Sequence, residues 1–119
     1  MVMFRSRTRV LGAAVLGVIL LGTVAPSAAQ PADATISMTS EAFTPVEVHV
    51  APGQTVVWSN PNFLTHTVTA DDGSFDSGDL GTGKQFTMSF DSPGTYAYYC
   101  QYHGGPDGED MSGVIVVDG

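Results

Sequence analysis

Residues 35–117 alternate apolar and polar positions in short runs, each bounded by glycine, proline, asparagine or aspartate. Val46 to Val50 shows the pattern clearly, since its three valines share one face and Glu47 and His49 share the other. A period of two is typical of a half-buried β-strand, and no segment after residue 30 has a helical period. Similar runs predict strands over 35–38, 46–50, 54–59, 66–70, 85–90, 95–100 and 112–117.

Turn and loop signals separate these strands. Pro52-Gly53 and Pro93-Gly94 mark tight turns, and Asn60-Pro61-Asn62 breaks the strand before it. Residues 71–83 are rich in Gly, Asp and Ser, and residues 101–110 contain three Gly and one Pro, so we expect both to be loops. Seven or eight short strands close most naturally as a two-sheet antiparallel sandwich, which makes the expected fold class all-β.

The beginning of the chain has a different pattern. Three arginines precede an apolar run of thirteen residues from Val10 to Gly22, and small residues follow it. This order is typical of a secretory signal peptide, and thirteen apolar residues are fewer than a membrane span needs. We therefore expect a signal peptide at 1–29 and a folded domain at 30–119, with an uncleaved membrane anchor as the alternative.

The negative charge lies entirely in the expected domain. Residues 30–119 hold all twelve acidic residues and, in Lys84, a single Lys or Arg, which gives them a formal charge of −11 at pH 7. Such a surface repels nucleic acid and anionic lipid and favours a basic partner. Solubility outside the cell, or adaptation to a salty habitat, explains the same charge without a partner. For Asp71, Asp72, Asp76 and Asp79 the two explanations are steering of a basic redox partner and a solvated loop.

One cysteine, two histidines and a methionine form the group of residues with the clearest chemistry. Cys100 and His103 are close in sequence, Met111 directly precedes the last strand, and His66 begins another strand. A thiolate, two imidazoles and a weak thioether are the donors of a blue copper site. A metal would also stabilise a small exported domain whose lone cysteine cannot form an internal disulfide. The third histidine, His49, alternates outward on its strand, so we expect it at the surface.

The residues around these donors resemble the cupredoxin family, to which plastocyanin, amicyanin and pseudoazurin belong. The resemblance covers roughly residues 43–117. It is most specific from the cysteine to the methionine, and the Pro-Gly-Gln-Thr-Val stretch at 52–56 supports it. The resemblance implies an eight-stranded Greek-key β-sandwich with one copper ion at one end. The ligands that it implies are His66, Cys100, His103 and Met111.

Two departures from the family pattern concern the same loop. Seven residues separate His103 from Met111, a longer spacing than in plastocyanin and amicyanin, and Tyr102 stands where the family often has proline. Glu109 therefore competes with Met111 as the axial ligand. A carboxylate there would lower the reduction potential, because a hard oxygen donor favours Cu(II).

The resemblance implies a protein that shuttles single electrons by Cu(II)/Cu(I) cycling between redox protein partners, such as a basic cytochrome or oxidoreductase. It would be exported, in the periplasm, on the cell surface or secreted, as a monomer without stable membrane insertion after cleavage of the signal. The alternative is an extracytoplasmic copper carrier or buffer. An enzyme is not expected, because Cys100 and His103 share one short segment without a third orienting group, and three histidines are too few for further copper sites.

Overall fold

The computed structural model describes residues 32–119, so the predicted signal peptide at 1–29 lies outside the described residues. In the described part, no helix is long and apolar enough to span a membrane. Its strands are β1 (Ala34–Met38), β2 (Phe43–Thr44), β3 (Glu47–Val50), β4 (Thr55–Ser59), β5 (Thr69–Ala70), β6 (Gln85–Ser89), β7 (Gly94–Gly105) and β8 (Glu109–Val117).

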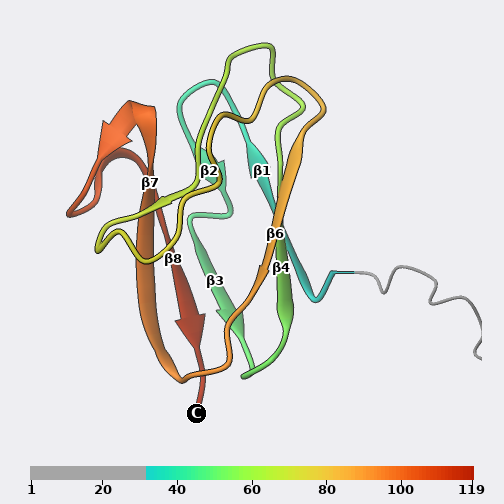
Figure 1. Ribbon diagram of the computed structural model, residues 1–119, viewed down its shortest axis with the longest axis vertical. Helices are drawn as coiled ribbons and strands as arrows, with labels where there is room; N and C mark the ends of the chain where they lie inside the picture. The colour runs from blue at the N-terminus through green and yellow to red at the C-terminus, as the bar shows by residue number, and fades with distance from the viewer. Residues whose placement is uncertain (1–31) are drawn as a thin grey trace, which may run out of the picture. The chain divides into compact units, whose positions relative to one another are not determined.

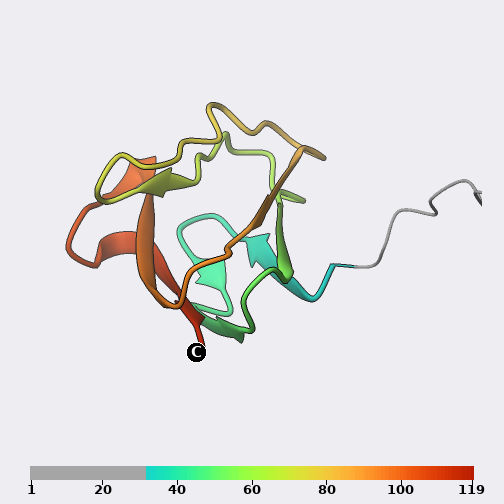
Figure 2. The ribbon, with the colours of Figure 1, turned by 60° about the horizontal axis from the view of Figure 1, so that its bottom comes forward.

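The strands form two four-stranded sheets, with orders β2-β1-β4-β6 and β3-β8-β7-β5. Figure 1 shows β7 and β8 on one side of the domain and β4 and β6 on the other, and Figure 2 shows the same two sheets from the end that carries the C-terminus. The predicted all-β, eight-stranded Greek-key sandwich is confirmed. The expectation of purely antiparallel pairing is wrong, because β1 pairs with β4 and β3 pairs with β8 in parallel. The chain passes from one sheet to the other at every connection from β2 to β7, so strands far apart in sequence become neighbours.

Aromatic side chains join the two sheets in the core. Burial alternates along β4, where Val56 and Trp58 are fully buried and their neighbours are only partly so. The ring of Trp58 meets that of Tyr98 on β7 edge to face, with centroids 5.4 Å apart, and Phe43 meets Tyr98 at 4.8 Å. Such pairs contribute about 0.5–1.5 kcal/mol each beyond their buried area.

The structure differs from the predicted elements in three places. Val46, expected to point inward, is 57% exposed and precedes β3. Of the strand predicted over 66–70, only the end forms β5, and His66 makes an isolated bridge to Leu80. The loop expected over 101–110 is instead a hairpin, in which β7 and β8 continue toward each other.

The glycines within 101–110 explain why a loop was wrongly expected there. The turn at 106–108 has two residues with positive φ, Asp107 at 65° and Gly108 at 78°. At Gly104 the facing backbone is so close that an added Cβ would overlap the carbonyl oxygen of Met111. These glycines therefore serve a tight turn and a close strand approach rather than an irregular loop.

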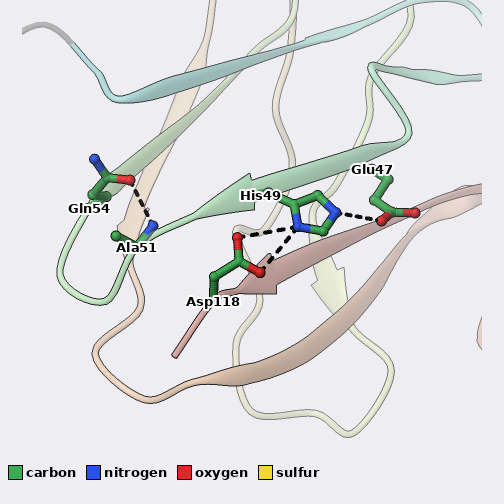
Figure 3. A network of polar contacts seen from close by, with 5 residues as sticks. All are labelled: Glu47, His49, Ala51, Gln54 and Asp118. Carbon is green, nitrogen blue, oxygen red and sulfur yellow. Dashed lines mark hydrogen bonds and ion pairs between the residues drawn. The ribbon is translucent and has the colours of Figure 1, made fainter.

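His49 lies at the surface, as predicted, and connects β3 to the segment after β8 (Figure 3). Its Nε2 lies 2.7 Å from a Glu47 carboxylate oxygen, and its Nδ1 lies 3.3 Å from both carboxylate oxygens of Asp118. Ionised carboxylates only accept hydrogen bonds, so both contacts form fully when both ring nitrogens carry protons. Glu47 in the first place, and then Asp118, raise the pKa of His49 above its ordinary value of 6.5.

We therefore expect this cluster to stabilise the fold more at low pH than at high pH. Because the pKa of His49 is raised in the folded state, its contribution is fully present below pH 6.5 and is lost as the pH rises through the folded pKa. The difference in unfolding free energy between the wild type and His49→Gln should shrink over that range, as measured by urea denaturation. Glu47→Gln should lower the pKa of His49, measured by NMR, more than Asp118→Asn does. A difference in stability that does not change with pH would contradict this assignment.

Candidate metal centre

A break in the pairing of β7 with β8 shapes the site. The two strands are in register up to Tyr99 and again from Gly104. Between these points the four residues 100–103 of β7 lie opposite Met111 alone. Such an excess of residues in one strand is a β-bulge, which bends the strand and redirects its side chains. The hairpin that carries the bulge lies at the end of the domain away from the C-terminus (Figure 1).

Three donor atoms converge at this bulge. The Cys100 sulfur lies 3.5 Å from Nδ1 of His103 and 3.6 Å from Nδ1 of His66. All three donor atoms lie within 4.8 Å of one another. Cys100 and His66 are fully buried, whereas His103 is partly exposed. The structure thus brings together three of the four side chains that the sequence singled out.

These separations fit a single metal ion. A sulfur and a nitrogen donor that bind one ion at about 2.3 and 2.0 Å, about 120° apart, lie about 3.7 Å from each other. The Cys100–His66 and Cys100–His103 separations are close to that value. A thiolate with two imidazoles is the donor set of a trigonal copper site. The residues present therefore fit copper in both donor type and spacing.

The buried side chain of Asn60 holds the segment that presents His66. Its amide nitrogen donates to the carbonyl oxygens of Leu64 and Leu80, both at 2.8 Å, and its amide oxygen accepts from the backbone of Asn62 at 2.9 Å. The sequence indicated Asn60 only as part of a strand break. The turn propensity of Asn60 was the available signal, but it did not reveal that the Asn60 side chain holds the segment that leads to His66.

Burial disfavours protonation of the His66 imidazole. Burial, and secondarily the neighbouring His103, lower the pKa of His66 below its ordinary value of 6.5, and the Thr39 backbone opposes this only in part. His66 Nε2 is buried without a hydrogen bond of ordinary geometry. A neutral imidazole has a lone pair available for a metal, so the environment of His66 favours metal binding over protonation.

The Cys100 sulfur has a hydrogen-bond donor of its own. The backbone N–H of Thr67, the residue after His66, donates to the sulfur at 3.4 Å. A donor to a thiolate withdraws electron density from the sulfur and so tunes any metal bound there.

Met111 and Glu109 occupy different environments. Met111 is fully buried in the same core cluster as Cys100, opposite the bulge. Glu109 is exposed and pairs across the hairpin with Gly105. The carboxylate of Glu109 lies beside Gly105, where an added Cβ would be 2.8 Å from its oxygen. Of these two side chains, the thioether of Met111 is therefore buried and the carboxylate of Glu109 is exposed.

The chain belongs to the cupredoxin-like domain family, whose model matches residues 12–117. It is 31% identical to a chloroplastic plastocyanin of Physcomitrium patens over 86 residues, which cover 63% of this chain and 49% of that protein. It is 30% identical to a plastocyanin of Scenedesmus fuscus over 86 residues, which cover 63% of this chain and 85% of that protein. The chain thus spans about half the length of the first relative and most of the second.

Solved structures show the same fold. A purple cupredoxin from Nitrosopumilus maritimus has a TM-score of 0.62 and 27% identity, over 72% of this chain and all of that one. A reduced Cu(I) form of an amicyanin variant has a TM-score of 0.65 and 25% identity, over 77% of this chain and 87% of that one. A copper-containing nitrite reductase from Thermus scotoductus has a TM-score of 0.64 and 25% identity, over 75% of this chain but only 23% of the enzyme. The chain therefore resembles the small proteins over most of their length and the enzyme over one part.

The close approach at Gly104 generates a prediction about the site. In Gly104→Ala the added Cβ would overlap the carbonyl oxygen of Met111 and lie 2.8 Å from that of Glu109, so the two strands must separate next to His103. We expect a loss of about 1–3 kcal/mol in unfolding free energy, measured by urea denaturation, together with weaker metal binding. Gly81→Ala is the control, because nothing lies within 4 Å of its added Cβ and Gly81 has no positive φ. Equal stability of the two variants would contradict the close approach.

Proposed function

We propose that the protein is a type 1 (blue) copper protein that carries single electrons between redox protein partners. The proposed ligands are His66, Cys100, His103 and Met111. The observation that carries the proposal is the convergence of one buried thiol and two imidazole nitrogens, 3.5 and 3.6 Å from the sulfur, in a member of the cupredoxin-like family. A bound copper ion would supply a one-electron Cu(II)/Cu(I) couple.

Each donor would contribute in its own way. Complete burial of Cys100 and His66 excludes water from the thiolate and from one imidazole. The Thr67 N–H bond would stabilise the negative sulfur and so favour the reduced form. Rigid positioning of the donors on paired strands would keep the site from rearranging when the charge changes, which keeps electron transfer fast.

Partly exposed His103 would be the route for electrons to the surface. The other two converging donors, Cys100 and His66, are fully buried, so the His103 ring is the nearest donor to solvent. The residues proposed to surround it are Phe63, Leu64, Gly104, Gly105 and Pro106. Phe63 is 83% exposed and Tyr102, beside His103, is 56% exposed, which supports docking of a partner through apolar contact at this end.

We also propose that the protein is exported as a monomer, after removal of residues 1–29, to the periplasm, the cell surface or the medium. The arginine-rich start and the short apolar run support an export signal. The formal charge of −11 on residues 30–119 supports a basic redox partner, a cytochrome or an oxidoreductase, and argues against nucleic acid.

The first test is the visible spectrum of the protein loaded with Cu(II), before and after ascorbate. We expect an intense blue band from thiolate-to-copper charge transfer that bleaches on reduction and returns on reoxidation. Cys100→Ser should abolish the band, and His49→Gln should leave it unchanged, because His49 is a surface residue in the cluster with Glu47 and Asp118. Tight copper binding without reversible bleaching would refute electron transfer and favour a copper carrier or buffer.

A second test separates the two candidates for the axial ligand. Met111→Leu removes a donor that stabilises Cu(II), so the reduction potential should rise by roughly 59 mV, a tenfold change in the ratio of Cu(I) to Cu(II). Glu109→Gln should leave the potential and the spectrum nearly unchanged, because Glu109 is exposed. Voltammetry measures both, and a larger shift for Glu109→Gln than for Met111→Leu would reverse the assignment.

A further inference from the structure

Carboxylates of one acidic segment reach the hairpin that carries three of the proposed ligands. We define the acidic segment as residues 71–79 and the ligand hairpin as residues 100–111. Asp79 accepts a hydrogen bond at 2.6 Å from the hydroxyl of Tyr102, which lies between Cys100 and His103 in sequence. Asp71 accepts one from the backbone N–H of Asp107, in the hairpin turn, at 2.9 Å.

A third carboxylate acts through two buried hydroxyls. Asp76 accepts from the hydroxyl of Thr69 at 3.2 Å, the Thr69 and Thr67 hydroxyls are 3.0 Å apart, and Thr67 Oγ1 accepts from the backbone N–H of Gln101 at 2.9 Å. An ionised carboxylate only accepts, so each hydroxyl in the chain donates toward Asp76 and accepts from the side of Gln101. This series of hydrogen bonds therefore links the exposed carboxylate of Asp76 to Gln101, the residue that follows Cys100.

The acidic segment is also joined to residues 66–68, which begin with His66. The backbone of Ser77 donates to Val68 at 2.9 Å. Just beyond the segment, Leu80 donates to and accepts from the backbone of His66, at 2.7 and 3.1 Å. Backbone bonds thus hold the segment to the His66 side, and carboxylates hold it to the ligand hairpin. It spans the two parts of the chain from which the donors come.

We propose that Asp71, Asp76 and Asp79 are positioning residues that hold the ligand hairpin against the His66 segment, so that the donors are assembled before a metal binds. The proposal rests on the proposed function only for the identity of the metal. The proposal gives Asp71, Asp76 and Asp79 a structural role. Neither partner steering nor a solvated loop would give these residues such a role.

Asp72 differs from the other three, because among the described residues its carboxylate accepts only from the backbone of Ser74, within its own segment. Asp76 has a similar bond from the backbone of Gly78 but also accepts from Thr69, outside the segment.

Asp72 therefore provides a matched control of the same charge in the same segment. The measurement is amide hydrogen exchange by NMR in the metal-free protein, which does not depend on electron transfer. We expect the Gln101 amide to exchange about tenfold faster in Asp76→Ala, and the Asp107 amide about tenfold faster in Asp71→Ala, since each loses hydrogen bonding that depends on a charged acceptor. Asp72→Ala should leave both rates unchanged.

A conservative variant separates hydrogen bonding from charge. Asp76→Asn removes the same charge as Asp76→Ala but keeps an oxygen that can accept from Thr69. It should therefore retain most of the protection of the Gln101 amide. If Asp72→Ala and Asp76→Asn accelerate exchange as much as Asp76→Ala does, the effect is one of net charge and the proposal is wrong. Unchanged exchange in Asp71→Ala and Asp76→Ala would also overturn it.

The surface contact of Tyr102 gives a second test that does not disturb buried hydroxyls. Transfer of Cu(I) from the loaded protein to a colorimetric chelator should be about threefold faster in Tyr102→Phe and in Asp79→Ala, because either variant removes the same bond. The double variant should be no faster than either single variant, as expected for one shared interaction. Additive effects, or rates equal to the wild type, would remove Asp79 from the proposal.

Discussion

The register break between β7 and β8 is the constraint on which the candidate site depends. A regular antiparallel pair would send Cys100 and His103 to opposite faces, because they are an odd number of residues apart. The four residues that face Met111 alone remove this restriction and let the thiol and an imidazole meet 3.5 Å apart. Paired residues flank the break on both sides, at 94–99 before it and at Gly104 and Gly105 after it, so the distortion is confined to the residues that use it.

A buried thiol, and buried backbone groups near the imidazole of His66, would be costly without hydrogen-bond partners, and the surrounding chain supplies these partners. Thr67 donates to the sulfur from its backbone and, through its hydroxyl, holds the residue after Cys100. Asn60 holds the segment that leads to His66, because its side chain forms hydrogen bonds with three backbone groups at once. The backbone around both donors is therefore satisfied within the protein, which keeps the donors in place without relying on water.

Most strands and the converging donors could be predicted from the sequence, but from different features of it. Period-two alternation indicates strands because it is a local property, and the Cys-to-Met spacing indicates a metal site because few other functions use that combination. The parallel pairing of β1 with β4 and of β3 with β8 was not predictable from these patterns, since it depends on where the chain changes sheets. The hairpin over 101–110 was missed because glycine and proline mark loops and tight strand contacts alike. The links from Asp76 and Asp79 to the hairpin join residues far apart in sequence, and no local pattern reports them.

The parallel pairing has a consequence for how the domain comes to be folded. β3 is hydrogen-bonded only to β8 within its sheet, and Glu47 pairs with Val114 far along the chain. β3 can therefore join its sheet only after β7 and β8 are available, which makes the topology rich in non-local contacts and slow to form. The hairpin with three of the proposed donors lies between the same two late strands. An emerging chain would thus remain without an assembled metal site until its last strands pair, and a metal ion would meet either scattered side chains or a finished centre.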